Sequence, residues 1–464
     1  MRISFFGGTK TVTGANYLLE IGKRKILIDC GLFQDPILKT KNQEPFPYEP
    51  REIDAIIATH AHLDHTGRLP KLVKEGFSGK IFATPPTLNL TELILEDELE
   101  IISQFSQTKK NDNQLFSHKD LKRTLNLFEP VEYYRKIESF PEISFRFLDA
   151  GHILGSAIIE IYLKPKQRKK DIIKIVFSGD LGNPPTPLLR PTDFPGSGDY
   201  ILIESAYGDK IHQDFLQRKN LLEDTIENTI KNKGVLMIPT FAIERTQEIL
   251  YELNELVENR RIPKVPIFID SPMAIRAIKI YKKYQKYYNK EAVYILKSGD
   301  DIFNFPNLTF VKSAKESRAI DNVPSPKIII AGSGMSEGGR ILYHEKKYLS
   351  DTKNCLLLIC YQVEGTRGRE IQDGKRTIEI FKDIIPVRAK IAQIQGYSAH
   401  ADRNTLFSWL YRIKSGALNL RKNIVKKVFV VQGEEKPAQS FAQLIKDKLG
   451  IEAIIPEYGQ RFEL

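Results

Sequence analysis

Residues 1–206 alternate short apolar runs with polar turns, a pattern that predicts strands joined by loops and a few helices. Four of these runs have the length and content of buried strands, at Ile3–Gly8, Asn16–Ile21, Lys25–Cys30 and Asp54–Thr59. Residues 89–106 place apolar side chains at helical spacing and carry several acidic residues, so a long amphipathic helix is expected there. Ser117 and Asp120 have the spacing of a capping box, which predicts the start of another helix.

From residue 207 the pattern changes to helices that alternate with strongly apolar strands. Helices are expected at 215–232, 244–259 and 278–290, and strands at 234–239, 265–270, 327–332 and 355–361. This alternation is typical of a doubly wound parallel sheet with helices on both faces. After residue 386 the first pattern returns. We therefore expect an α/β protein in which residues 1–206 and 386–464 form one domain and residues 207–385 form an inserted one.

Length and composition limit the number of domains, the cellular compartment and the class of partner. A chain of 464 residues is longer than one hydrophobic core usually accommodates, so two domains are expected. No apolar stretch has the ~20 residues of a membrane helix, and the N-terminus lacks the apolar region of a signal peptide. Three cysteines without paired spacing indicate buried thiols in a reducing cytoplasm. A net charge of +11 favours a polyanionic partner such as nucleic acid, although many lysine-rich proteins bind none.

The most informative residues are His60, His62, Asp64 and His65, which follow the predicted strand at 54–59 in the pattern H-x-H-x-D-H. Alternate side chains of an extended segment point the same way, so His60 and His62 can converge on one point, while Asp64 and His65 face a second. Three imidazoles and a carboxylate in six positions suit two zinc ions. The alternative is a polar loop in which histidines gather by chance, but this window holds three of the eight histidines in the chain.

Further ligands are expected at the ends of other strands. His152 lies beside two glycines in DAGHILGS, and Asp180 lies in VFSGDLG, where a carboxylate could bridge two metals. Asp29 ends the predicted strand at 25–30 and is positioned to accept an N–H from a ligand histidine. Alone, each would be an ordinary turn residue; together and in this order they favour a metal centre.

These residues resemble the first four motifs of the metallo-β-lactamase superfamily, and the rest of the chain resembles its β-CASP nucleases. The second likeness rests on IESAYGDKIH with Glu204, on FAIERTQEIL, IDSPMA and AGSGMSEGGRILYH, and on GYSAHAD with His400. It is strongest to prokaryotic ribonucleases related to the cleavage and polyadenylation endonuclease. The resemblance implies an αββα sandwich with an inserted β-CASP domain and a dinuclear metal site.

The resemblance also implies a function, which is zinc-dependent endonucleolytic hydrolysis of single-stranded RNA by a metal-activated hydroxide. Asp64 would belong to the catalytic group, and His400 would act as general acid, oriented by Glu204. A structural histidine and a plain salt bridge are the alternatives for these last two. Mn²⁺ is a possible substitute for Zn²⁺. The implied partner is RNA and not a membrane, and a homodimer is left open.

One residue departs from the family pattern. In the segment FVVQGEE, Gln432 stands where the nucleases carry a histidine that binds the second zinc. Gln432 could serve as a weak zinc ligand through its amide oxygen, in place of the stronger imidazole, so the second site is expected to be weakened. A catalytically weakened RNA-binding or scaffold homologue is therefore the alternative function.

Phosphate-binding residues are the last candidates. Ser333 and Gly334 could present backbone N–H groups to a phosphate, and Arg340 could add charge; an ordinary strand-to-helix turn explains the same residues equally well. His344 could contact phosphate or only cap its helix.

Overall fold

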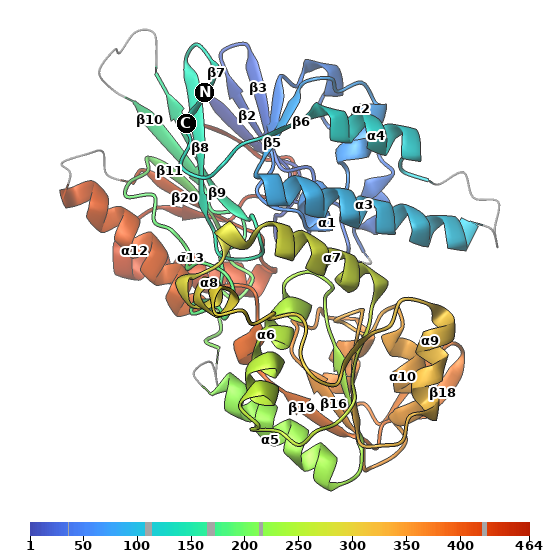
Figure 1. Cartoon of the computed structure of the whole chain (residues 1–464). Helices are drawn as coiled ribbons and strands as arrows, with labels where there is room; N and C mark the ends of the chain where they lie inside the picture. Colours follow the sequence, from blue (N-terminus) through green and yellow to red (C-terminus); the bar gives the residue numbers. More distant parts are fainter. Residues whose placement is uncertain (36, 107–113, 165–171, 213–216, 420–424) are drawn as a thin grey trace. The chain divides into compact units, whose positions relative to one another are not determined.

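The computed structural model describes residues 1–35, 37–106, 114–164, 172–212, 217–419 and 425–464. These residues form two compact units (Figure 1). Unit 1 comprises Met1–Pro184, Pro191–Ile211 and His400–Leu464, and unit 2 comprises Pro185–Arg190 and His212–Ala399. The sequence predicted an inserted domain at residues 207–385. In the structure, the chain passes from unit 1 into unit 2 between residues 211 and 212 and returns to unit 1 between residues 399 and 400.

Unit 1 contains two seven-stranded sheets. The first has the order β22-β1-β2-β3-β4-β5-β6 and the second β21-β20-β11-β10-β9-β8-β7. The strands of the first sheet are β1 (Arg2–Phe5), β2 (Tyr17–Ile21), β3 (Arg24–Ile28), β4 (Ala55–Ile57), β5 (Lys80–Ala83), β6 (Phe128–Pro130) and β22 (Arg461–Glu463). Those of the second are β7 (Ile137–Phe140), β8 (Ile143–Asp149), β9 (Ala157–Leu163), β10 (Ile173–Phe177), β11 (Tyr200–Glu204), β20 (Lys427–Val431) and β21 (Ala453–Ile454).

Helices cover the outer face of each sheet, so unit 1 is an αββα sandwich (Figure 1). The helices beside the first sheet are α1 (Leu63–Thr66), α2 (Leu69–Lys74), α3 (Pro85–Ser106) and α4 (His118–Leu127), and those beside the second are α12 (Arg403–Asn419) and α13 (Glu435–Leu449). Leu69, Leu72 and Val73 of α2 share a core with the first sheet. Trp409 of α12 and Phe441 of α13 share one with the second. The capping box of Ser117 and Asp120 is confirmed at α4.

Aromatic rings fill the space between the two sheets. The rings of Phe5 and Phe429 lie 5.2 Å apart, and those of Phe82 and Phe145 lie 5.1 Å apart. Burial of such large side chains is the main stabilising contribution to a sandwich of this kind. The strand ends that carry the predicted ligands are thereby held on a rigid core.

Unit 2 is built on a six-stranded parallel sheet with the order β14-β13-β15-β12-β16-β19. Its strands are β12 (Val235–Pro239), β13 (Ile267–Asp270), β14 (Leu308–Phe310), β15 (Lys327–Ala331), β16 (Cys355–Leu358) and β19 (Lys390–Gln393), with a separate hairpin of β17 (Thr377–Ile380) and β18 (Asp383–Pro386). The helices are α5 (Arg218–Lys231), α6 (Arg245–Glu258), α7 (Pro272–Lys283), α8 (Lys290–Lys297), α9 (Ala314–Ala319), α10 (Ile341–Tyr348) and α11 (Arg367–Gln372). Figure 1 shows α5 and α6 on one side of this sheet and α9 and α10 on the other.

The α/β fold expected from the sequence is thus confirmed, with a sandwich and a doubly wound insertion. One strand lies differently from expectation. β19 falls after residue 386, where the first pattern was expected to return, but it pairs in parallel with β16 of unit 2. Among the described residues, no helix is both long and apolar enough to cross a lipid bilayer.

Candidate metal centre

The predicted ligands lie at the ends of strands from both sheets of unit 1. His60 follows β4, and the turn into α1 carries His62, Asp64 and His65. From the second sheet, His152 follows β8 and Asp180 follows β10. We call these six residues the metal cluster.

Three imidazoles form one corner of the metal cluster. The Nδ1 of His62 lies 3.1 Å from Nε2 of His60 and 3.2 Å from Nε2 of His152. The Oδ2 of Asp180 lies 3.5 Å from Nε2 of His60 and 3.7 Å from Nε2 of His152. Ligand atoms of these four residues all lie within 4.8 Å of one another. Three ring nitrogens and a carboxylate facing a common point form a donor set suited to a divalent cation.

Thr59 and Asp29 orient the histidines that leave the first sheet. Thr59 donates its N–H and its hydroxyl to the two oxygens of Asp29, at 2.7 and 2.8 Å. The same hydroxyl oxygen lies 3.1 Å from Nδ1 of His60 and accepts its proton. Nε2 of His60 therefore keeps its lone pair. Such hydrogen bonds fix ring orientation and tautomer in metal-binding histidines.

Asp64, His65 and Asp180 form a second corner. Nε2 of His65 lies 3.4 Å from Oδ1 of Asp180 and 3.7 Å from Oδ2 of Asp64. The Oδ1 of Asp180 is buried and makes no hydrogen bond with any described residue. A buried acceptor without a donor is costly, and a cation would satisfy it. The residues thus fit a metal at this corner too, with Asp180 between the two positions.

Electrostatics within the metal cluster favour unprotonated ligands at two positions. Burial, followed by the charge of His65, lowers the pKa of His60 well below its usual value. Burial alone would raise the pKa of Asp180, but His65 and His60 outweigh it and lower that pKa well below normal. Burial raises the pKa of Asp64 to about 6. His60 and Asp180 are therefore held in the forms that bind metal.

Gln432 follows β20 and lies against His65. Its Nε2 is 3.1 Å from Nε2 of His65 and also donates to the carbonyl of Val12 at 3.1 Å. Its Oε1 accepts from the hydroxyl of Tyr17 at 3.0 Å. The side chain is almost completely buried, with 4% exposed.

Two influences on His65 oppose each other. Burial disfavours its charge, but the carboxylates of Asp180, Asp29 and Asp64 raise its pKa well above the usual value. The Val12 carbonyl can only accept, so it fixes the amide NH₂ of Gln432 beside the ring. Nδ1 of His65 lies 2.7 Å from Oδ2 of Asp29 and donates its proton there.

His400 and Glu204 form a pair beside the metal cluster. Glu204 ends β11, and His400 forms an isolated bridge with Gly182, just after Asp180. Nδ1 of His400 lies 3.2 Å from Oε2 of Glu204, whose Oε1 accepts from the N–H of Leu181 at 2.5 Å. Burial lowers the pKa of His400, but the adjacent Glu204 outweighs it and raises this pKa to about 9. The contact with Glu204 thus favours the charged form of the His400 ring.

The candidate phosphate-binding residues lie in unit 2, and two of them contact an acidic side chain. Arg340 donates to Oδ1 of Asp270 at 2.6 Å, and His344 contacts its Oδ2 at 2.8 Å. Ser317 donates to Oδ2 at 2.5 Å. We call these four residues the Asp270 cluster. Its contacts supply a structural reason for Arg340 and His344 that involves no phosphate.

Ser333 and Gly334 lie in the turn after β15. The hydroxyl of Ser333 accepts from the N–H groups of Glu337 and Gly338, at 3.0 and 3.2 Å. A Cβ at Gly334 would lie 2.9 Å from the sulfur of Cys360, so the turn packs closely there. These contacts favour the turn interpretation of the two residues.

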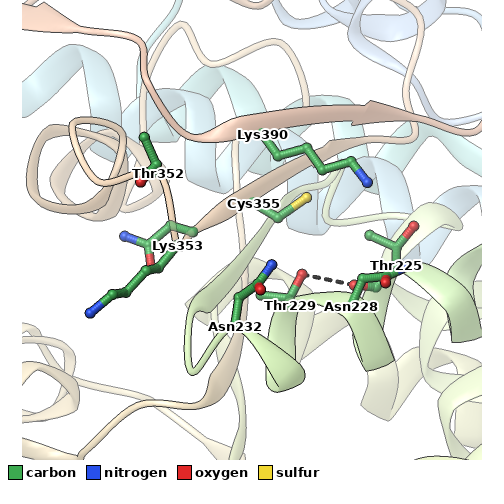
Figure 2. A pocket seen from close by; sticks show the side chains of 9 residues that line it. Thr225, Asn228, Thr229, Asn232, Thr352, Lys353, Cys355 and Lys390 are labelled. Carbon is green, nitrogen blue, oxygen red and sulfur yellow. Dashed lines mark hydrogen bonds between the residues drawn. The ribbon is translucent and has the colours of Figure 1, made fainter.

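A polar cavity of about 150 Å³ lies elsewhere in unit 2, at the amino ends of β16 and β19 (Figure 2). Its lining contains no histidine or carboxylate: Thr225, Asn228, Thr229, Asn232, Thr352, Lys353, Asn354, Cys355 and Lys390. The hydroxyls of Thr225 and Thr229 are bonded to carbonyls of their own helix. Parallel sheets bind ligands at the opposite, carboxyl ends of their strands, so this cavity lacks both the groups and the position of a catalytic site.

Three residues near the metal cluster were missed in the sequence, namely Val12, Tyr17 and Thr59. Thr59 directly precedes His60, and this adjacency was a usable signal. Tyr17 lies 415 positions from its partner Gln432. No local pattern connects these two residues.

Comparison with known families accounts for most of the chain. Residues 11–86 match the metallo-beta-lactamase superfamily, and residues 246–371 match the Beta-Casp domain. Residues 384–456 match the Zn-dependent metallo-hydrolase RNA specificity domain.

Known proteins match over nearly the full length. Ribonuclease TTHA0252 of Thermus thermophilus is 35% identical and covers 99% of this chain, which in turn covers 99% of that protein. The chain belongs to the β-CASP ribonuclease family of the metallo-β-lactamase superfamily. An RNase J-like protein of Methanocaldococcus jannaschii is 31% identical, with 98% of both chains covered. Transcription termination factor FttA of Methanosarcina mazei is 31% identical over 97% of this chain and 70% of its own length.

A solved structure supports the fold. A protein of unknown function from Enterococcus faecalis V583 superposes with a TM-score of 0.53 at 13% identity, covering 100% of this chain and 99% of its own. As a β-CASP family member, the chain is a metal-dependent hydrolase and an RNA nuclease.

Proposed function

We propose that the chain is a zinc-dependent endoribonuclease that cuts single-stranded RNA. The observation that supports this most is the convergence of His60, His62 and His152 with Asp180. We assign these four residues to a first metal. Asp64, His65 and Asp180 are assigned to a second and weaker position, with Mn²⁺ as a possible substitute for Zn²⁺.

Metal bound at such a centre supplies Lewis acidity toward a phosphodiester and lowers the pKa of water. The protein's own residues perform the remaining tasks. Asp29 and Thr59 hold the rings of His60 and His65 through the hydrogen bonds described above. The buried carboxylate of Asp180 contacts His60 of the first ligand set and His65 of the second, and so links the two proposed metal positions.

We assign proton delivery to His400. Its raised pKa, about 9, keeps the ring charged at neutral pH. Nδ1 faces Glu204, so Nε2 carries the second proton, and we assign that proton to the leaving oxygen of the RNA. A positioned general acid contributes about 10²–10⁴ in rate. Glu204 acts as the positioning residue because it is fixed by the N–H of Leu181.

Three further observations support RNA in a cytoplasmic setting. The net charge of +11 favours a polyanion. Residues 384–456 match a domain described by RNA specificity. The three cysteines are free thiols, as expected in a reducing compartment.

The test uses a circular single-stranded RNA, because only an endonuclease can linearise it. With Zn²⁺ present, the protein should cut this RNA and leave DNA of the same sequence intact. Asp180→Asn should lose the activity, and Asp447→Asn, at an exposed position of α13, should keep it. Turnover of a small ester or thioester without RNA cleavage would refute the proposal. RNA binding without cleavage at any metal concentration would favour the scaffold alternative, for which the contact between Gln432 and His65 is the supporting observation.

A further inference from the structure

The side chain of Gln432 carries an inference about metal stoichiometry that rests on the proposed metal ligands. Gln432 occupies the space beside the second metal position, but its oxygen faces Tyr17 and not His65. The group nearest to Nε2 of His65 is therefore a hydrogen-bond donor. A donor at this place acts differently from a weak ligand.

The polarity of the amide is fixed by its neighbours. The carbonyl of Val12 can only accept, so the amide NH₂ must face it. The hydroxyl of Tyr17 then donates to Oε1 on the other side. Turning the amide over would place Oε1 against the Val12 carbonyl, where two acceptors would face each other.

The backbone around Gln432 is equally specific. The N–H of Gln432 donates to the carbonyl of Gly8 at 2.8 Å. A Cβ at Gly8 would lie 2.0 Å from Oε1 of Gln432 and 2.3 Å from the hydroxyl of Tyr17. Gly8 thus leaves the space that the Tyr17–Gln432 pair needs.

The amide also has a consequence for His65. Nε2 of this ring is the nitrogen that faces Asp64 and Asp180, at 3.7 and 3.4 Å. The NH₂ of Gln432 lies 3.1 Å from the same nitrogen. The second metal position is therefore bordered by a donor group, which a cation cannot use as a ligand.

We propose that Gln432 is a built-in plug that closes the second metal position, so that the protein binds one divalent ion tightly at the three-histidine corner. A second ion can bind only if the Gln432 amide moves away, which leaves buried hydrogen-bond donors without partners. The loss of these hydrogen bonds lowers the affinity for the second ion by about 5- to 150-fold. A plug and a missing ligand both lower the affinity of the second site for metal. Only in the case of a plug should replacing Gln432 with a side chain that neither donates a hydrogen bond nor binds metal raise that affinity.

The experiment counts bound ions and uses Gln432→Met as the decisive variant. Methionine has a similar length but cannot donate a hydrogen bond, and its thioether is a poor ligand for Mn²⁺. Metal-free proteins are titrated with Zn²⁺ and with Mn²⁺, and affinities for the first and second equivalents are measured by calorimetry and elemental analysis. The wild type should bind one equivalent tightly. Gln432→Met should bind the second equivalent at least about tenfold more tightly than the wild type does, and Gln432→His should bind it more tightly still.

A second variant keeps the test decisive if Gln432→Met folds poorly. Tyr17→Phe retains Gln432 but removes the donor that holds Oε1, so second-site affinity should rise by a smaller factor. Thermal unfolding checks each variant.

Equal second-site affinity in the wild type and in folded Gln432→Met would overturn the plug while leaving the metal centre intact. Two tight equivalents in the wild type would overturn it as well. Failure of the wild type to bind even one ion would refute the metal centre itself and the plug with it.

Discussion

Among the described residues, each unit contains a cluster of histidine and aspartate side chains, and the two clusters differ in how donors and acceptors are balanced. In the metal cluster, three ring nitrogens converge and a buried oxygen of Asp180 makes no hydrogen bond with a described residue. In the Asp270 cluster, donors from Ser317, Arg340 and His344 satisfy both oxygens of one carboxylate. The two clusters share residue types and a position at strand ends. The excess of acceptors is what marks the first as a site for a cation.

The largest effect is expected for substitution of His400. This variant tests whether a residue beside the metal cluster affects the rate of RNA cleavage without affecting the stability of the fold. His400→Ala should lower RNA cleavage by about 10²–10⁴-fold because the leaving oxygen loses its proton donor. Bound metal and the unfolding temperature should change little. Single-turnover cleavage and metal analysis measure the two properties. Loss of a whole metal equivalent would make His400 a ligand and end its assignment as an acid.

The Asp270 cluster should behave in the opposite way. Asp270→Ala leaves Arg340 as a half-buried charge without its carboxylate, and breaking a buried pair costs about 3–5 kcal/mol. The free energy of unfolding of unit 2 should fall accordingly in urea titrations. RNA affinity of the folded variant should be unchanged. A large loss of RNA affinity with normal stability would show instead that Arg340 and His344 belong to a phosphate site.

Glu345 on α10 is an intermediate case, since its Oε1 accepts from Ser336 at 2.5 Å but its buried Oε2 makes no hydrogen bond with any described residue. Burial raises its pKa to about 7. The folded state therefore binds a proton more tightly than the unfolded state, and stability from this group is present below pH ~4.5 and lost as pH rises through about 7.

Glu345→Gln should remove that dependence and gain up to about 3 kcal/mol at pH 8, at 1.36 kcal/mol per pKa unit. Urea unfolding at pH 5, 6, 7 and 8 measures the change. The exposed Glu227 on α5 offers the matched control, since Glu227→Gln should leave the pH profile as it is. An unchanged profile in Glu345→Gln would mean that a donor reaches Oε2 in solution.

The smallest effect concerns Glu244, a buried acid whose backbone is strained. Its φ of 68° and ψ of −56°, with a hydrogen bond from the N–H of Arg245 to the carbonyl of Ile243, describe a tight γ-turn. Glycine adopts this conformation without strain. The carboxylate of Glu244 offsets the strain by accepting from Tyr281 at 2.5 Å.

Two variants separate these contributions. Glu244→Gly loses the hydrogen bond but relieves the strain, so its stability should lie within about 1 kcal/mol of the wild type. Glu244→Ala loses the bond and keeps the strain, and should be less stable than Glu244→Gly by about 1 kcal/mol. Equal stability of the two variants would show that the turn relaxes. Thermal unfolding of the three proteins makes the comparison.

The sequence predicted those features that depend on neighbouring residues. The six candidate ligands and Asp29 follow apolar runs, so their position at strand ends was readable before the fold was known. The sequence was a poorer guide to side chains whose role depends on a partner far away in the sequence. Arg340 and His344 gave no sign that Asp270 lies between them, and Gln432 gave no sign of Tyr17. β19 was placed with the wrong sheet neighbours because a short strand has the same pattern in either sheet.

The pairing of β11 with β20 sets an order of events during synthesis of this chain. Tyr200 lies opposite Lys427 in parallel register, so the second sheet of unit 1 is completed only after all of unit 2 has left the ribosome. His60, His62, His152 and Asp180 emerge early, whereas His400 follows Asp180 by 220 positions. At about 5–20 residues per second, that interval lasts roughly 10–45 s. The candidate metal ligands thus leave the ribosome well before His400, to which we assign proton delivery, so the proposed cleavage activity can arise only after unit 2 has been made.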